Sequence, residues 1–386
     1  MRCNPVIRIA LVAHLSEISG AGVALLGTAR GLDPARFRAA IVLPGNGPLG
    51  RRARGLGIGT VVVANPEKSL ASSSLPRRVA IAFSRLVTAV RLAALFRRFD
   101  VIYVNSSVSI FPGLAAWLSH RRVVWHIHEV IENPGAAARL KMRVIERLAD
   151  AVIYASAASE AAFPARRVRR RLIAKNYVGI AQYRDAVRDP RTEQSLGIEE
   201  NERVVVTNGM FPRKGTDIFA RAAAETARML SSPARFIIIG AATSEHEAFR
   251  REVADFIDTC GMKDRIVFAG FRDDLPAILK RADAFVSASR NEAAPIAIIE
   301  AMAAGAPVVA TDVGDCRAML GDGRMGLIVA PRDAAALARA IADALENPGA
   351  ARARAKLAAE WAAREYAPDQ FWKPLENLLE DVARET

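Results

Sequence analysis

Two glutamates, Glu292 and Glu300, lie in the segment of the chain with the clearest chemical pattern. Glu292 follows a short apolar run and stands in a loop, and Glu300 stands in an almost wholly apolar helical stretch that ends at Gly305. An isolated carboxylate is costly in apolar surroundings unless something binds it, which argues against the alternative of two solvated side chains. Carboxylates accept hydrogen bonds from neighbouring hydroxyl groups, so the pair predicts a site for a ribose or a sugar.

The helical stretch that carries Glu300 begins at Pro295, Ile296 and Ala297. The amino end of a helix favours anions, because its backbone N–H groups have no partners within the helix. We therefore expect a diphosphate at these residues, beside the two carboxylates.

Two cations, Arg213 and Lys214, follow the apolar run Val204–Thr207 and precede Gly215 and a helical stretch. Fixed cations at the end of a strand can neutralise the charge that develops on a departing diphosphate, a role that metal ions play in other transferases. We predict that this pair is catalytic and that no metal ion and no cofactor is needed, since no Asp-x-Asp pattern follows a strand. The alternative is a solvated basic turn.

The first half of the chain has weaker signals. Gly20 and Gly22 follow an apolar run, where small residues let the backbone approach a phosphate or a sugar, although a tight turn explains them equally well. His126 and His128 share one face of a strand end, and we expect His126 to be structural. The residues Asn105–Ser107 end another run and either contact an acceptor or cap the next helix.

The two glutamates and the sequence that follows them resemble a known family. Their Glu-x7-Glu spacing, continued from Glu300 as Glu-Ala-Met-Ala-x-Gly-x-Pro-Val-Val, is similar to that of the retaining glycosyltransferases of family 4, which have the GT-B fold. The resemblance covers Val204–Leu345 and, more loosely, the first half. It implies a UDP- or GDP-sugar donor, a ribose contact for Glu300, and contacts with the donor sugar for Glu292 and His128. Asn208-Gly209 departs from the family, many of whose members have Gly-Arg there.

Short apolar runs rich in Val and Ile alternate with helical stretches along the whole chain, which is typical of buried parallel strands. The predicted strands are Ile7–Val12, Arg38–Leu43, Val61–Ala64, Val101–Asn105, Val123–Ile127, Ala151–Ala155, Leu172–Asn176, Val204–Thr207, Phe236–Gly240, Ile266–Ala269, Ala284–Ser287, Pro307–Ala310 and Gly326–Val329.

This alternation predicts two doubly wound, Rossmann-like domains, which in the GT-B fold face each other across a cleft. We expect an acceptor-binding domain over residues 1–185, a linker over 186–202 and a nucleotide-sugar-binding domain over 203–360. A last helix within 361–386 can cross back to the first domain.

The charge is divided unevenly between the halves of the chain. Residues 1–185 hold 28 Lys and Arg against 10 Asp and Glu, whereas residues 186–386 hold 26 against 31. Such a basic half points to an anionic surface, and the arginine-spaced stretch from Arg77 to Arg98 suits either a membrane interface or a core helix with a solvated face. Nucleic acid is not expected, because only 6% of the residues are aromatic and no nucleic-acid motif is present.

The lengths of the apolar runs and the pattern of cysteines indicate in which cellular compartment we expect the protein. No apolar run is long enough for a membrane span or a signal peptide, and the three cysteines form no disulfide or thiolate pattern. We expect a cytoplasmic protein that can bind peripherally to the inner face of the plasma membrane.

The sequence thus predicts a glycosyltransferase that moves a hexose, with retention, from a nucleotide sugar to a hydroxyl of a lipid-linked or polysaccharide intermediate. Two alternatives are a sugar-nucleotide epimerase with the same fold and an inactive sugar-nucleotide-binding protein, the latter suggested by Asn208-Gly209.

Overall fold

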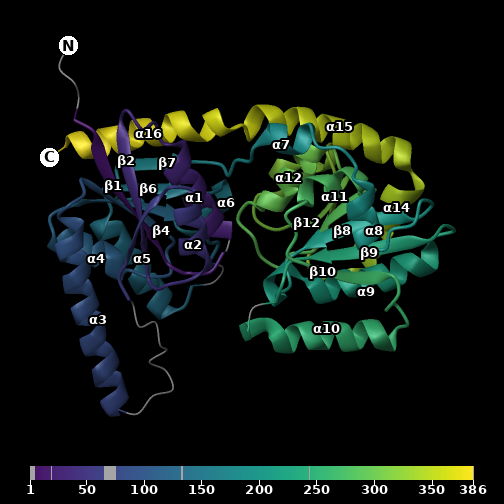
Figure 1. Cartoon of the computed structure of the whole chain (residues 1–386), viewed down its shortest axis with the longest axis horizontal. Helices are drawn as coiled ribbons and strands as arrows, with labels where there is room; N and C mark the ends of the chain where they lie inside the picture. Colours follow the sequence, from purple (N-terminus) through teal and green to yellow (C-terminus); the bar gives the residue numbers. More distant parts are fainter. Residues whose placement is uncertain (1–4, 19, 65–74, 132–133, 243, 386) are drawn as a thin grey trace. The chain divides into compact units, whose positions relative to one another are not determined.

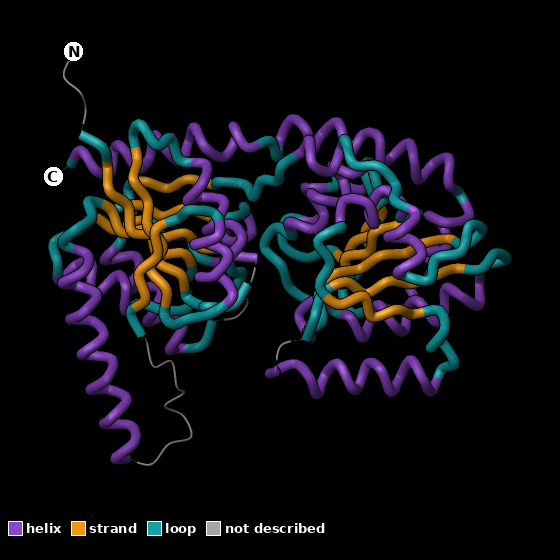
Figure 2. The backbone as a smooth tube through the Cα atoms, in the orientation of Figure 1, coloured by secondary structure: helices purple, strands orange, loops and turns teal. Residues whose placement is uncertain are grey.

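The computed structural model describes residues 5–18, 20–64, 75–131, 134–242 and 244–385. They form two units: Met1–Lys175 together with Phe371–Thr386, and Asn176–Gln370 (Figure 1). In each unit the strands form a central layer with helices on both faces (Figure 2). No helix among these residues has the length and apolar character needed to cross a membrane.

The first unit is built on a seven-stranded parallel sheet with the order β3-β2-β1-β4-β5-β6-β7. Its strands are β1 (Ile7–Ala13), β2 (Phe37–Leu43), β3 (Gly59–Val62), β4 (Val101–Asn105), β5 (Arg122–Ile127), β6 (Ala151–Tyr154) and β7 (Arg170–Ile173). Its helices are α1 (Gly20–Gly31), α2 (Pro48–Gly55), α3 (Leu75–Phe96), α4 (Phe111–Leu118), α5 (Ala136–Leu148), α6 (Ala157–Ala162) and the part of α16 (Pro368–Arg384) from Phe371 onward.

The second unit is built on a six-stranded parallel sheet with the order β10-β9-β8-β11-β12-β13. Its strands are β8 (Arg203–Asn208), β9 (Ala234–Ile239), β10 (Ile266–Gly270), β11 (Ala284–Ser287), β12 (Val308–Thr311) and β13 (Leu327–Val329). Its helices are α7 (Ile180–Arg184), α8 (Pro190–Ser195), α9 (Thr216–Met229), α10 (Glu247–Thr259), α11 (Leu275–Arg281), α12 (Ile296–Ala304), α13 (Cys316–Met319), α14 (Ala334–Glu346) and α15 (Pro348–Glu365).

Both sheets reverse their strand order at one point, between β1 and β4 in the first unit and between β8 and β11 in the second. The connections on the two sides of such a point leave in opposite directions, so the carboxyl ends of the two strands face open space. Open α/β sheets bind their ligands at these switch points. Each unit therefore has one sheet edge where a site is expected.

The predicted doubly wound, Rossmann-like architecture is confirmed. All thirteen predicted runs overlap an observed strand, and Val101–Asn105 and Ala284–Ser287 match their strands from end to end. The run Leu172–Asn176 is displaced most, because pairing with β6 already begins at Arg170.

The boundary between the units lies earlier than the sequence suggested, after Lys175 rather than residue 185. The stretch 186–202, expected to be a linker, contains α8 and packs within the second unit. Asp189 caps this helix, Thr192 Oγ1 donates to Asp274 Oδ2 at 2.6 Å, and Leu196 is buried. At the other end of the unit α15 continues to Glu365, beyond the expected limit at 360.

The last helix contributes residues 371–384 to the first unit. Leu375, Leu379 and Val382 on α16 are fully buried, and Glu376 accepts a hydrogen bond from the Asp33 backbone N–H. Gly31 meets the same helix, since a Cβ atom at this position would lie 2.0 Å from the Trp372 ring. Distant segments of the sequence therefore share one core.

Candidate active site

The switch point of the second sheet is lined by two loops, residues 209–215 after β8 and 288–295 after β11. Gly215 brings the loops together: its φ is +67° and a Cβ atom there would lie 2.0 Å from the carbonyl oxygen of Ala288. Only glycine combines that conformation with such a close approach. The loops are held further by the Arg290 backbone N–H, which donates to the Arg213 carbonyl oxygen at 2.8 Å.

Glu292 lies between the two predicted cations. Its carboxylate oxygens are 2.8 Å from Arg213 Nη1 and 2.9 Å from Lys214 Nζ, and the Glu292 and Lys214 side chains are both largely buried. Burial alone would raise the pKa of Glu292, but the charges and hydrogen bonds of Lys214 and Arg213 outweigh it, and the pKa is lowered. Glu292 is therefore ionised at neutral pH, and the three side chains form one charged cluster.

Arg290 stabilises the basic turn that carries this cluster. Its guanidinium binds the Asp217 carboxylate through two hydrogen bonds of 2.8 and 2.5 Å, and Nη1 also donates to the Pro212 carbonyl oxygen at 2.5 Å. Sequence reasoning missed this pair, because 73 residues separate its members. Gly314, also missed, lets a third loop pack against the site, since a Cβ atom there would lie 2.0 Å from the Glu292 carbonyl oxygen.

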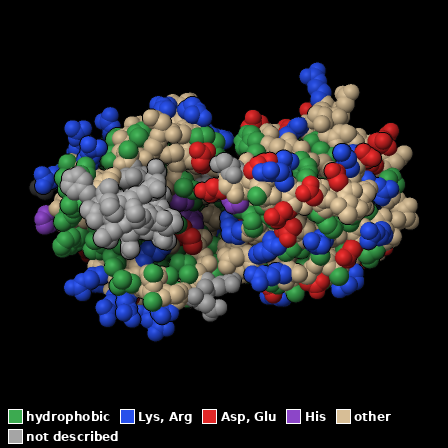
Figure 3. Space-filling model, turned by 90° about the horizontal axis from the view of Figure 1, so that it is seen from below, with side chains coloured by type: hydrophobic (Ala, Val, Ile, Leu, Met, Phe, Trp, Pro, Cys, Tyr) green, Lys and Arg blue, Asp and Glu red, His purple; other side chains and the backbone are tan. Residues whose placement is uncertain are grey.

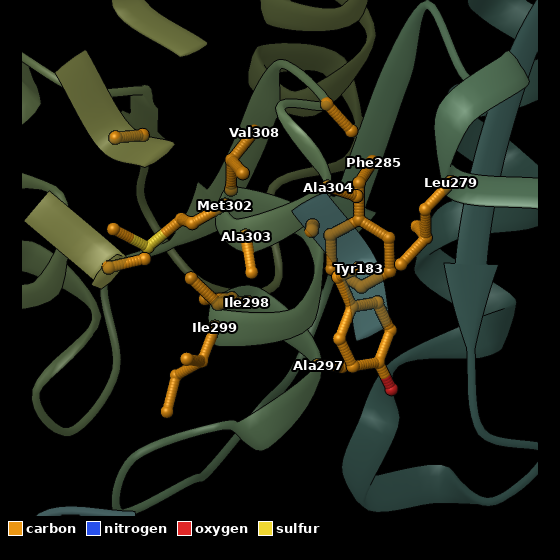
Figure 4. Packing of buried hydrophobic residues seen from close by; sticks show 14 of the residues in the cluster. Tyr183, Leu279, Phe285, Ala297, Ile298, Ile299, Met302, Ala303, Ala304 and Val308 are labelled. Atoms are coloured by element: carbon orange, nitrogen blue, oxygen red, sulfur yellow. The ribbon is translucent and has the colours of Figure 1, made fainter. Parts of the chain in front are cut away.

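Glu300 is half-buried on α12. This helix is apolar on nearly all sides, as expected for a helix inside a core (Figure 4). Its carboxylate accepts a hydrogen bond of 2.6 Å from the hydroxyl group of Tyr183 on α7. Burial raises the pKa of Glu300, although Tyr183 and the charge of Lys214 act in the opposite direction. The Tyr183 ring packs beside the α12 residues while its hydroxyl oxygen points out of the cluster (Figure 4).

The amino end of α12 is where the sequence located it. Pro295 is the N-cap and forms no side-chain cap hydrogen bond, and Ile296 and Ala297 are the first two helical residues. The structure thus brings Arg213, Lys214 and Glu292 together at one sheet edge, with Glu300 close enough for the Lys214 charge to lower its pKa.

The other predicted residues lie at the switch point of the first unit. His128 directly follows β5, and its Nε2 is 2.8 Å from Oδ1 of Asn105, the last residue of β4. Asn105 Nδ2 donates to the Ala21 carbonyl oxygen at 2.9 Å, in the first turn of α1, where Gly20 and Gly22 also lie. The glycines therefore belong to the helix itself and not to a turn before it.

The two histidines differ in their surroundings. His126 is buried, its Nδ1 lies 2.5 Å from the Tyr103 hydroxyl, and its ring is 3.9 Å from that of His128 between centroids. Burial, together with His128, lowers the pKa of His126 well below its usual value. Burial also lowers the pKa of His128 to about 4, although Glu129 acts in the opposite direction. Both rings are therefore uncharged at neutral pH.

Ser106 and Ser107 do not cap α4, whose N-cap is Ile110. Their hydroxyl groups instead donate to the Glu129 carboxylate at 2.5 and 2.9 Å. Ser106 adopts a φ of +146°, a conformation that non-glycine residues rarely adopt. A cavity of about 20 Å³, room for roughly one water molecule, is lined here by His14, Asn105 and Ser106.

Among the residues described, no three His, Cys, Asp or Glu side chains lie close enough together to hold a metal ion. The second switch point holds two cations, one ionised carboxylate, and a second carboxylate with a raised pKa.

The fold and this charged edge define a two-domain Rossmann-like protein of the GT-B type. Residues 202–347 match the model of the family described as glycosyl transferases group 1, and residues 19–178 match that of the glycosyl transferase 4-like domain. These matches cover both units, and the chain belongs to the group 1 glycosyltransferases.

Individual relatives are similar over part of their length. The lipopolysaccharide core biosynthesis mannosyltransferase LpcC of Rhizobium leguminosarum is 36% identical over 141 residues, which is 36% of this chain and 39% of that protein. LpsB of Rhizobium meliloti, with the same description, is 32% identical over 203 residues, or 50% and 55%. The chain thus aligns with about half or less of these two relatives.

Solved structures show the same fold over nearly the whole chain. The Anabaena protein Alr3699/HepE, in a crystal structure with UDP and glucose, superimposes with a TM-score of 0.84 at 23% identity and covers 97% of this chain and 100% of that one. At this identity the likeness shows the fold alone.

Proposed function

We propose that this protein transfers a sugar from a nucleoside-diphosphate sugar, with UDP or GDP as the nucleotide, to a hydroxyl group of a saccharide acceptor, with retention of configuration. The observation that carries the proposal is the cluster of Arg213, Lys214 and Glu292 next to the half-buried carboxylate of Glu300 at the switch point of the second sheet. Such an edge offers cations for a diphosphate and carboxylates for hydroxyl groups.

Arg213 and Lys214 are proposed to hold the diphosphate. The Arg213 side chain is 51% exposed, and its Nη1 contacts Glu292 and the Asn291 carbonyl oxygen. We propose that the exposed part of its guanidinium donates to a phosphate oxygen. Lys214 supplies a charge that is largely shielded from water. Cations held in advance at this position stabilise the leaving group without reorganising during the reaction. They would do so without a metal ion.

Glu300 is proposed to bind the hydroxyl groups of the ribose, and Glu292 those of the donor sugar. The Tyr183 hydroxyl group donates to Oε1 of Glu300. The second carboxylate oxygen, Oε2, can then accept a hydrogen bond from a ribose hydroxyl group. The backbone N–H groups at the start of α12, from Ile296 and Ala297, are proposed to contact the phosphates.

His128 is proposed to contact the donor sugar as a neutral ring with a defined tautomer. Asn105 uses its Nδ2 to donate to the Ala21 carbonyl oxygen, so its Oδ1 faces His128 and must accept a hydrogen bond from Nε2–H. The remaining nitrogen, Nδ1, then carries a lone pair and can accept a hydrogen bond from a sugar hydroxyl. Asn105 would act as the residue that positions this lone pair.

The acceptor is proposed to be a lipid-linked saccharide at an anionic membrane. The Rhizobium relatives are described as enzymes of lipopolysaccharide core biosynthesis. In the first unit, Leu86 and Val90 on α3 and Trp117 and Leu118 on α4 are apolar side chains that are each more than half exposed, and these two helices pack together. Lys and Arg side chains are spread over this unit (Figure 3).

Positive charges lie in and just after α3. Arg91, Arg97 and Arg98 are exposed near its carboxyl end, whereas the side chains of Arg77, Arg78 and Arg85 lie outside the described residues. Exposed apolar side chains among arginines suit an interface with anionic headgroups.

The proposal is tested first by binding. A thermal-shift screen of UDP, GDP and their hexose derivatives should identify one nucleotide, because a ligand at 100 times its Kd stabilises the folded protein by about 2.7 kcal/mol. The Glu300→Gln variant should lose about tenfold in affinity for that nucleotide, the scale of one hydrogen bond to a charged group. Equal affinity of a folded Glu300→Gln protein would contradict the assigned ribose contact.

Turnover of the identified donor then distinguishes the alternatives. A transferase releases or transfers the sugar, an epimerase converts it to its epimer, and an inactive binding protein leaves it unchanged. We expect transfer that survives EDTA. Loss of transfer in EDTA with recovery on adding Mg²⁺ would show that the two cations do not replace a metal ion.

A further inference from the structure

The second unit has another cavity at the opposite edge of its sheet. This basic cavity has a volume of about 380 Å³ and is lined by residues at the amino ends of β8, β11 and β12, namely Arg203, Asp283 and Pro307, and by parts of α11, α12, α14 and α15. Volumes of this order hold small ligands. Strand β11 separates it from the Glu292 loop by four residues, or roughly 13 Å.

The basic cavity carries more positive than negative charge. Its charged lining residues are Arg188, Arg203, Lys280, Arg281, Arg352 and Asp283. Five cations therefore face the cavity with one carboxylate.

Nearby carboxylates are shared between the arginines. Glu193 lies 2.8 Å from Arg188 Nη2 and 3.4 Å from Arg281 Nε, and Asp283 lies 3.0 Å from Arg281 Nη1 and 3.5 Å from Arg203 Nη1. Two carboxylates thus serve three guanidinium groups, and Asp283 Oδ2 also accepts the Val204 backbone N–H. The network leaves little negative charge for further cations.

Unused donors remain at the cavity wall. Within the described part of the chain, neither Lys280 nor Arg352 has an ion-pair partner within 4.0 Å. Lys280 does lower the pKa of Asp185, but this carboxylate is exposed and is already hydrogen-bonded to Arg184.

Helix α15 adds to the positive potential. It begins at Pro348, which lines the cavity, and its N-cap residue Asn347 forms no side-chain cap, since its amide donates to Asp343 instead. The amino end of this 18-residue helix therefore presents uncapped N–H groups and the positive end of its dipole. The carboxyl ends of α11 and α12 also reach the cavity, so its cations have helix carbonyl groups nearby as well.

We propose that the basic cavity binds a phosphorylated small molecule, at a site separate from the cluster of Arg213, Lys214 and Glu292. Guanidinium groups and an ammonium group around one space suit the several oxygens of a phosphate. The apolar lining from Ala304 and Leu345 leaves room for the group that carries the phosphate. This inference does not depend on the proposed sugar transfer.

Isothermal titration calorimetry with inorganic pyrophosphate tests the proposal, with wild-type protein and two matched double variants. Lys280→Gln/Arg352→Gln removes the two unpaired cations, and Arg251→Gln/Lys263→Gln removes the same charge from an exposed surface of this unit. We expect the first variant to lose at least tenfold in pyrophosphate affinity and the second to keep it. Nucleotide affinity at the other sheet edge should be unchanged in both.

Two results would overturn the proposal. One is the absence of pyrophosphate binding to the wild-type protein at millimolar concentration. The other is equal affinity in the wild-type protein and in a folded Lys280→Gln/Arg352→Gln protein, with circular dichroism as the check of folding.

Discussion

At the scale of single residues, the proposed ribose contact of Glu300 should make donor binding depend on pH. Burial raises its pKa, so its carboxylate takes up a proton at a higher pH than an ordinary glutamate does. If the ionised form binds the ribose, donor affinity should fall as the pH falls through this raised pKa. The free protein should respond in the opposite direction: the charged form is penalised in the folded state, so this group adds stability at low pH that is lost as the pH rises through the raised pKa.

The hydrogen bond from Tyr183 should influence the pH at which donor affinity falls. Tyr183→Phe removes the hydrogen bond of 2.6 Å to Glu300 and keeps the packed ring. Since the bond favours the ionised form, the step in donor affinity should move up by about one pKa unit, and it should disappear in Glu300→Gln. Nucleotide binding measured by calorimetry from pH 5 to 8 gives both results. If the fall in donor affinity occurs at the same pH in Tyr183→Phe as in the wild type, Glu300 is not the group whose titration causes it.

Variants of Lys214 and Glu292 can distinguish an effect on the stability of the folded protein from an effect on turnover. Lys214→Met should destabilise the protein by about 2 kcal/mol, less than the roughly 3–5 kcal/mol expected for a buried charge left without partners, because Arg213 still pairs with Glu292. Adding Glu292→Gln removes the buried charge and should restore much of that stability. Turnover should stay on the order of 100-fold low in both variants. Urea unfolding and a transfer assay measure the two quantities, and recovered turnover in the double variant would refute the role given to Lys214.

The sequence predicted part of this residue-level arrangement. Carboxyl ends of neighbouring parallel strands meet at one edge, so the proximity of Arg213, Lys214 and Glu292 could be predicted from spacing alone. The partner of Glu300 could not, because Tyr183 lies 117 residues away on a five-residue helix with no motif. The same holds for the bond between Asn105 and His128, which depends on how two strand ends are turned.

At the scale of elements, the packing of loop 209–215 against loop 288–295 depends on Gly215. Gly215→Ala introduces both a strained φ of +67° and a clash with the Ala288 carbonyl oxygen, so it should cost about 3 kcal/mol or more. Gly261→Ala is the matched control: its φ is +70° but a Cβ atom there meets nothing within 4 Å, so only the strain of roughly 1 kcal/mol remains. If both variants lose the same free energy of unfolding in urea, loop 288–295 can move away from a Cβ atom at position 215 at no energetic cost.

The strands were predictable as elements because buried parallel strands read as continuous apolar runs. The boundary between the units was not. Residues 176–202 look polar along the sequence, yet Ile180, Tyr183 and Leu196 are buried in the core of the second unit. A few well-placed apolar side chains decide membership of a core, and average polarity does not reveal them.

At the scale of the whole molecule, the basic first unit should attract anionic lipid. Each arginine near a charged surface contributes about 1 kcal/mol, and the Debye length shrinks from about 10 Å at 0.1 M salt to about 3 Å at 1 M. Binding to phosphatidylglycerol vesicles should therefore be strong at low salt and weak at high salt. Co-sedimentation at the two salt concentrations measures this, and a wild-type protein that stays in the supernatant at low salt would exclude the membrane surface.

Matched variants locate the surface. Arg91→Gln/Arg97→Gln/Arg98→Gln removes three exposed charges near the carboxyl end of α3, and we expect vesicle binding to fall. Arg51→Gln/Arg52→Gln/Arg54→Gln removes the same charge from α2 and should bind nearly as the wild type does. Equal losses would mean that total charge, and not this surface, governs binding.

The return of residues 371–386 to the first unit affects how the protein can be made. During synthesis the ribosome delivers residues 1–175 first, but the bond from Asp33 to Glu376 and the packing of Trp372 on Gly31 must wait until the entire second unit has been translated. At roughly 5–20 residues per second that interval lasts about ten seconds or more. Over this time the nascent first unit should expose the apolar surface that Leu375, Leu379 and Val382 later cover, and we expect chaperones to bind it while the chain is still being translated.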